Sequence, residues 1–101
     1  MLRSVLCHAV ISGRKIYRHS IVIYDDTRPD IAPLIREFEG EVHSTEAFNG
    51  VAVILPYDFE VPAGLSNIDV VGFSAQISAI AEVCPDVHGC ANTRVQFVPL
   101  T

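Results

Sequence analysis

The chain has 101 residues, which is enough for one domain and too few for two domains of ordinary size. Half of the residues are hydrophobic and only 19% are charged, which excludes an intrinsically disordered chain. The net charge of −5 argues against nucleic-acid binding, which needs clustered Lys and Arg to neutralise phosphates. We predict a single domain over residues 1–101, with its core at about 20–80, an N-terminal strand within 1–18 and a C-terminal extension over 81–101.

The apolar segments of the chain are all short. None approaches the roughly 20 residues that a helix needs to cross a bilayer, so we expect no membrane partner. The N-terminus lacks the long apolar region of a signal peptide, which favours a cytoplasmic protein. The three cysteines agree with a reducing compartment, or with one disulfide and one free thiol.

Two extended segments come first. Residues Val5–Ser12 are mostly apolar and β-branched, and they predict a strand that ends at a turn over Gly13–Lys15. Ile16–Tyr24 predicts a second extended segment, and residues 25–30 form a polar break. The only basic cluster, Arg14 with Lys15 and Arg18, is typical of a solvated turn.

The strongest helical pattern covers Asp30–Glu39. Its apolar residues recur at i, i+3, i+4 and i+7, which places them in one stripe on a helix. Thr27 or Asp30 can cap its start, Pro33 lies in its first turn, and Gly40 follows its end. The stripe consists of Ile31, Leu34, Ile35 and Phe38, and we expect it to pack on Val22, Val53 and Val71.

The middle of the chain has the pattern of a hairpin. Glu41–Phe48 alternates imperfectly and predicts a strand, and Asn49-Gly50 is a strong hairpin turn signal. Val51–Leu55 is apolar throughout, which predicts a central strand that Pro56 ends.

The last third of the chain is less regular. Residues 57–67 predict a connector with a short, weak helix, and Ile68–Phe73 predicts a strand. Ser74–Val83 is compatible with a helix or an extended segment, residues 84–90 form a loop, and Thr93–Val98 predicts a last strand. Between Ser20 and Phe73 the predicted order is β-α-β-β-(α)-β.

This order predicts an α+β fold with a ferredoxin-like antiparallel sheet, helices on one face and added terminal strands. The added strands are Val5–Ile11 and Val95–Val98. Because unpaired apolar edge strands invite pairing, we expect these two to pair with each other in one sheet or between subunits.

Several segments within Ser20–Ile80 have a shared pattern. Ile21–Asp26 is an apolar strand that ends in acidic residues, Phe48–Pro56 contains Asn-Gly and ends in Leu-Pro, and Ile68–Phe73 is rich in valine. Together with Phe38–Val42, these segments resemble the propeptide-type inhibitors of subtilisin-like serine proteases. In that family the domain inhibits the protease or assists its folding.

The resemblance implies that an extended segment lies in the protease cleft, where it gains affinity by strand addition. Ile80 would then enter the primary specificity pocket and Ile77 a second apolar pocket. The alternative is a helix over Ser74–Val83 with Ile77, Ile80 and Ala81 packed on the sheet. The protease-binding segment implied by the resemblance is Ala75, Gln76, Ile77, Ser78, Ala79 and Ile80.

Motifs for catalysis or for cofactors are sparse. Cys84 and Cys90 are separated by five residues, whereas zinc ligands are usually separated by two to four, so we expect no metal site. A disulfide between these two cysteines is geometrically possible. The neighbouring carboxylates of Asp25 and Asp26 would diverge on a strand, and the chain has no Gly-x-Ser-x-Gly motif or glycine-rich phosphate loop. We predict no catalytic residues and no cofactor.

Three function classes therefore remain open. The first is a domain that binds a subtilisin-like serine protease or another protein. The second is a small structural or assembly protein, such as a phage or viral accessory protein, that forms homo-oligomers; the mean hydropathy of +0.34 agrees with a covered apolar surface. The third is a regulatory domain that binds a small molecule.

Overall fold

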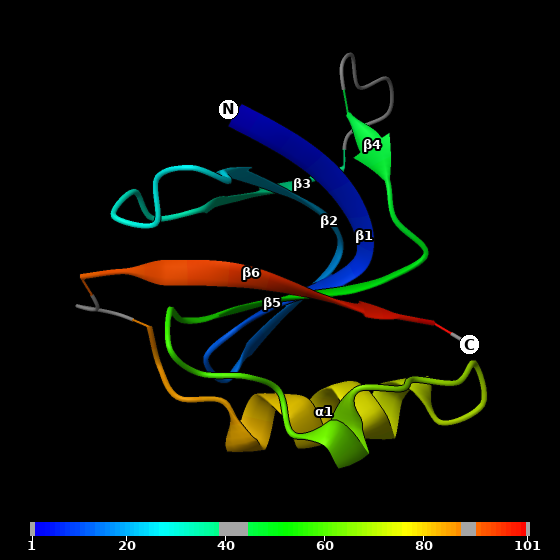
Figure 1. Cartoon of the computed structure of the whole chain (residues 1–101). Helices are drawn as coiled ribbons and strands as arrows, with labels where there is room; N and C mark the ends of the chain where they lie inside the picture. Colours follow the sequence, from blue (N-terminus) through cyan, green and yellow to red (C-terminus); the bar gives the residue numbers. More distant parts are fainter. Residues whose placement is uncertain (1, 39–44, 88–90, 101) are drawn as a thin grey trace.

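The computed structural model describes residues 2–38, 45–87 and 91–100, and in this part a mixed six-stranded sheet is covered on one face by an α-helix (Figure 1). The predicted α+β class is therefore confirmed. The elements are β1 (Leu2–Ser12), β2 (Lys15–Asp25), β3 (Leu34–Glu37), β4 (Glu46–Ala47), β5 (Gly50–Pro56), the short 3-10 helix η1 (Ala63–Leu65), α1 (Phe73–Val83) and β6 (Thr93–Pro99).

The β1–β2 hairpin turn lies where the sequence predicts it. The antiparallel register of the two strands leaves Gly13 and Arg14 as a two-residue turn. Gly13 has a φ of 60°, whereas Arg14 has no positive φ, and this is the pattern of a type II′ turn. Such a turn follows the right-handed twist of the strands that it joins.

The β1–β2 ladder is interrupted at His8 and His19. The register pairs the residues on both sides of the two histidines but not the histidines themselves, and His19 has a left-handed φ of 47°. Residues two apart in a strand normally share a face, yet Cys7 belongs to one hydrophobic core and Ala9 to the other. Odd-numbered side chains of β1 therefore point to one face of the sheet before the interruption and to the other face after it. The strand is strongly curved (Figure 1).

Strand β1 is central and changes its partner along its length. Its first half pairs with β4 and its second half with β5, in both cases in parallel orientation. On its other side it is antiparallel to β2, which pairs with β3. Strand β6 pairs antiparallel with β5, so the order is β3-β2-β1-β5-β6.

The first core lies between the sheet and α1. The helix presents Ile77, Ile80 and Ala81 at helical spacing, and the two isoleucines are fully buried. They pack against apolar side chains of the sheet, of the connector 57–68 and of β6. These partners include Ala9, Ile11, Val51, Val53, Leu55, Val61, Ile68 and Val98.

The second core lies on the opposite, concave face of the bent sheet. The sheet itself encloses it, since its buried members come from β1, β2 and β5. Aromatic rings pack against one another in this core. The ring centroids of Phe48 and Phe97 are 5.1 Å apart, and those of Tyr24 and Phe97 are 6.0 Å apart. The buried residues are Val5, Cys7, Val10, Val22, Ala52 and Ile54.

The connector after β5 is attached to the α1 face of β6 by two side chains. The Arg94 guanidinium donates to the carbonyl oxygen of Phe59 at 2.7 and 3.0 Å, and the Gln96 side-chain oxygen accepts from the Val61 N–H at 3.0 Å. The short helix expected in the connector is observed as η1. These contacts fix the connector against the sheet.

The helix predicted over Asp30–Glu39 is wrong. Leu34–Glu37 forms β3, and Ile31, Leu34 and Phe38 are exposed rather than packed in a core. Hydrogen bonds to β2 satisfy this backbone, so long-range pairing overrides the short helical pattern. Ile35 nevertheless lies opposite Val22 as a strand partner. The other expected contact, Val71, is 99% exposed.

The strand predicted over Ile68–Phe73 is also wrong. Only Ile68 forms a bridge, to Leu100, and Gly72 precedes α1. The helical alternative for Ser74–Val83 is the observed one, so the extended conformation expected for residues 75–80 is wrong. When this segment is a helix, its apolar stripe packs against the sheet, whereas an extended segment would expose these side chains.

The expected hairpin at Asn49-Gly50 is not formed. The two flanking strands, β4 and β5, both pair with β1 and not with each other. Of the strand expected over Glu41–Phe48, Glu46–Ala47 is observed and residues 41–44 lie outside the described residues. The terminal strands share one sheet but do not pair with each other, because β5 lies between β1 and β6, so the expected pairing within one chain is wrong. Strand β1 is the centre of the sheet rather than an addition, and the ferredoxin-like element order is not the one observed.

Two substitutions distinguish the observed helix from the one that the sequence predicts. We expect Leu34→Ala to change the free energy of unfolding by less than about 0.5 kcal/mol, because this side chain is 63% exposed. Ile80→Ala should lower it by about 2–5 kcal/mol, because the side chain is fully buried. Urea denaturation followed by circular dichroism measures both values, and the reverse order of effects would contradict this assignment.

Candidate functional site

A cleft of about 890 Å³ lies at one end of the sheet, where three chain reversals meet. They are the β1–β2 turn, the loop between β2 and β3, and the segment after α1, all near the start of β6 (Figure 1). Its lining combines apolar residues of the concave core, namely Tyr17, Ile35, Ile54 and Val87, with the charged residues Arg14, Lys15, Asp30, Glu82 and Asp86.

The β1–β2 turn forms one wall because Gly13 has no side chain. A Cβ atom on Gly13 would lie 3.3 Å from the Cα atom of Asp86, closer than most real contacts of this kind. The turn can therefore pack directly on the segment that follows α1. This contact places Arg14 and Lys15 at the rim of the cleft.

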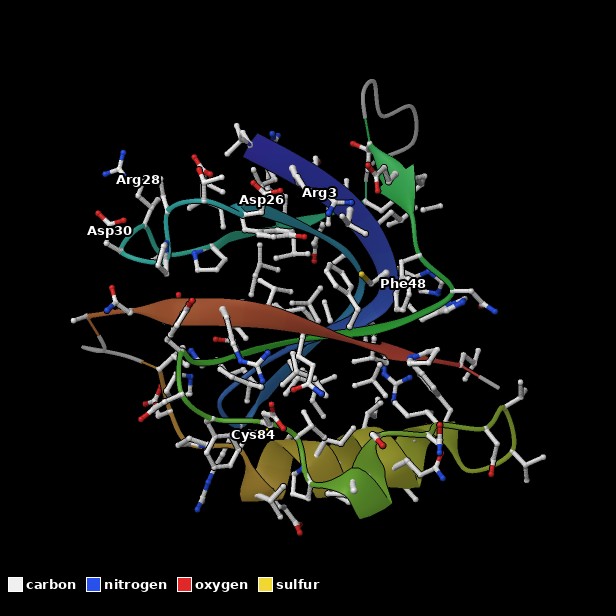
Figure 2. The ribbon with its side chains drawn as sticks, in the orientation of Figure 1. Arg3, Asp26, Arg28, Asp30, Phe48 and Cys84 are labelled. Atoms are coloured by element: carbon white, nitrogen blue, oxygen red, sulfur yellow. The ribbon has the colours of Figure 1, made fainter. Side chains whose placement is uncertain are left out.

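The loop between β2 and β3 forms a second wall and is held by local hydrogen bonds. The Asp25 carboxylate accepts from the N–H and the hydroxyl of Thr27, at 2.9 and 2.7 Å. The carbonyl oxygen of Pro29 accepts from the N–H of Thr93 at 2.9 Å, which attaches the loop to β6. Asp30 forms a bidentate ion pair with Arg28 at 3.1 Å (Figure 2).

The cleft is lined by Lys15, Ser12 and Ile54, which belong to a row of side chains that crosses the sheet. Lys15 lies opposite Ser12, Ser12 opposite Ile54, and Ile54 opposite Val95. Directly opposed residues share a face, and neighbouring strands are about 4.8 Å apart. An ammonium group, a hydroxyl and an apolar surface thus follow one another across the concave face.

Thr93 carries an unpartnered polar group in the wall. It lies two residues before Val95 on β6, so its side chain shares the concave face. The residue is only 8% exposed, and its hydroxyl has no hydrogen-bond partner within the described chain. The other buried hydroxyl, that of Ser20, donates to the carbonyl oxygen of Arg18 at 3.0 Å. A buried hydroxyl without a partner costs about 1–3 kcal/mol.

The cations at the rim are free to bind a ligand. The side chains of Arg14 and Lys15 are exposed and make no ion pair or hydrogen bond with any described residue. Most of the other basic side chains are engaged: Arg3 pairs with Glu46, Arg28 with Asp30, Arg18 with Ser74 and Arg94 with Phe59.

Cys7 and Cys84 are buried free thiols, and only Cys84 lines the cleft. Cys84 contributes to the cleft wall at the end of α1, on the other side of β6 from Asp30 (Figure 2). Burial raises the pKa of the Cys84 thiol, and burial raises the pKa of Cys7 to about 12. Both groups are therefore thiols rather than thiolates at neutral pH.

The site residues predicted from the sequence lie elsewhere. Residues 75–80 belong to α1, in which Ile77 and Ile80 are buried against the sheet and the Gln76 side chain accepts from the Asp69 N–H at 2.9 Å. Binding of a protease by this segment stays a prediction. Cys90, considered with Cys84 as a metal ligand or disulfide partner, lies outside the described residues.

Sequence reasoning did not identify the cleft, because its walls come from segments far apart in the chain. The one visible signal was the glycine turn followed by Arg14 and Lys15, which the sequence indicates only as a solvated cluster. Within residues 2–38, 45–87 and 91–100, no group of three or more His, Cys, Asp or Glu residues is arranged to hold a metal ion. In the same part of the chain, no helix has the length and apolar character to span a membrane.

Comparisons with protein-family models, with curated proteins and with solved structures give no match for this chain. No function can therefore be transferred from a relative. The cleft and its polar groups are the features from which a function can be inferred.

The wall between the β1–β2 turn and Asp86 can be tested with glycine substitutions. Gly13→Ala should lower the free energy of unfolding by about 1–2 kcal/mol, because the residue has a left-handed φ and packs on a neighbouring backbone. Gly64→Ala is the matched control: no atom lies within 4 Å of its Cβ position, so stability should be unchanged or higher. Equal losses in urea denaturation for the two variants would contradict the close contact at Gly13.

Proposed function

We propose that this protein is a small-molecule-binding domain and that the ligand occupies the cleft beside the β1–β2 turn. The observation that carries the proposal is the buried Thr93 hydroxyl in the wall of this cleft, which has no hydrogen-bond partner among residues 2–38, 45–87 and 91–100. A native fold retains such a group at a cost in stability, and a ligand atom that bonds to it removes that cost.

The size and chemistry of the cleft support the proposal. Its volume of about 890 Å³ falls within the range of about 300–1,000 Å³ that is typical of small-molecule sites. Such sites combine an apolar lining with a few polar groups that fix the orientation of the ligand. Here Ile35 and Ile54 supply apolar surface, and Ser12, Lys15 and Thr93 supply polar groups.

The walls are also pre-ordered. The Pro29–Thr93 hydrogen bond, the Arg28–Asp30 ion pair and the contact at Gly13 hold the three reversals in place. Binding then requires little ordering of the protein, so less of the interaction free energy is lost.

The two protein-binding functions are supported less well. Insertion of residues 75–80 into a protease cleft would require α1 to unwind, and this would expose Ile77 and Ile80. Self-association through strand edges would use β3, which has four residues and carries the charged Arg36 and Glu37, or β6, which carries Arg94 and ends at Pro99. Short, charged edge strands are typical of sheets that avoid such pairing. Inhibition of a protease and homo-oligomer formation stay predictions.

A cleft-filling substitution tests the proposed site. Ala32 is exposed and lines the cleft, so Ala32→Trp should fill the cleft without disturbing a core. Ala75→Trp, at an exposed position of α1, is the matched control. A fragment library screened by saturation-transfer NMR should give ligands that bind the wild type and Ala75→Trp but not Ala32→Trp. Hits that bind Ala32→Trp equally well, or a wild type that binds no fragment, would overturn the proposal.

Removal of the unpartnered hydroxyl should stabilise the free protein. Thr93→Val keeps the shape of the side chain and removes a buried group without a partner, so the free energy of unfolding should rise by about 1 kcal/mol. In a domain of this size, that gain corresponds to a rise in Tm of about 4–8 °C. Thr27→Val is the control, because it removes a hydroxyl that donates to Asp25 and should not raise the Tm. A lower Tm for Thr93→Val would show that the hydroxyl is satisfied.

A further inference from the structure

We infer that the ligand of the cleft is an organic anion with an apolar body, whose carboxylate binds at Arg14 and Lys15. The inference rests on the proposed function, because it names the chemical class that the same cleft would take. It follows from the charges at the rim and from the row of side chains that crosses the sheet.

A pair of adjacent cations at the rim favours an anion. Arg14 and Lys15 are adjacent, exposed and without side-chain partners within the described chain. In a protein with a net charge of −5, such an unpaired pair of cations is unusual and attracts carboxylates.

The carboxylates of Asp30, Glu82 and Asp86 also line the cleft. Asp30 is neutralised by its bidentate contact with Arg28, and Asp86 already has an interaction of its own. Glu82, on the exposed side of α1, has no partner among the described residues. Two cations and the carboxylates of Glu82 and Asp86 then remain at the rim. The two cations are neighbours on the β1–β2 turn, so the positive charge is local to Arg14 and Lys15, where an anion would bind.

The row of side chains across the sheet favours an apolar body next to the anionic group. Ser12 lies one strand from Lys15, and Ile54 lies one strand further. With a strand spacing of about 4.8 Å, apolar surface begins about 10 Å from the backbone of Lys15, within reach of its long side chain. A carboxylate at Lys15 can accept a hydrogen bond from the Ser12 hydroxyl while a chain of a few methylene groups lies over Ile54 and Ile35.

Three six-carbon probes of equal length separate charge from apolar contact. Hexanoate, 1-hexanol and hexylammonium would be titrated into isotopically labelled full-length protein, with the amide resonances of Ile54 and Thr93 as reporters. Hexanoate should bind more tightly than either of the other two probes. Lys15→Glu should weaken hexanoate binding by at least about tenfold, as expected for the loss of a charge-assisted contact, and leave 1-hexanol binding unchanged.

Arg36→Glu is the matched control, because Arg36 is also an exposed strand cation without a side-chain partner in the described chain, but it does not line the cleft. It should leave the affinity for hexanoate unchanged. If 1-hexanol shifts the cleft resonances and hexanoate binds no more tightly, or if Lys15→Glu has no effect, the ligand class is wrong and the cleft remains a binding site. If none of the three probes shifts these resonances but fragments from the screen shift them, the proposed ligand class is wrong and the binding site stands. If nothing binds in the cleft, both proposals fail.

Discussion

The break in the β1–β2 ladder at His8 and His19 is the constraint on which the rest of the structure depends. Without it, the alternation of side chains would place Cys7 and Ala9 on the same face of β1. The break lets the first half of the hairpin direct its apolar residues into the concave core and the second half support α1. One long hairpin thus serves two cores, and the sheet must bend between them.

The cleft is a consequence of this bend. The only α-helix of the described residues packs on the face opposite the concave core and reaches the cleft only with its last turn, so turns and loops border most of the open end of that core. Ile35 and Ile54 therefore meet the charged rim residues at an open boundary rather than within a sealed interior. The close approach of Gly13 to Asp86 and the hydrogen bond between Pro29 and Thr93 set the width of this opening.

Local patterns predict the long strands of the fold well and its connections poorly. The segments that became β1, β2, β5 and β6 are apolar or β-branched and end at turn signals, which are properties of neighbouring residues. The apolar residues of 31–38 satisfy a helical period, and only their pairing with β2 makes them a strand. The break at His8 and His19 has no signature in the sequence. The cleft could not be predicted either, since Ser12, Ile54 and Thr93 become neighbours only through this topology.

The parallel pairing of β1 has a consequence for how the chain acquires its structure. Ala9 pairs with Val51, which lies 42 residues later, whereas the β1–β2 hairpin needs only local contacts. During synthesis the hairpin can form early, but the other edge of β1 has no partner until β5 has left the ribosome. Val10 and Ile11 are exposed to other nascent chains during this interval. The chain is therefore most prone to aggregation before β5 pairs with β1.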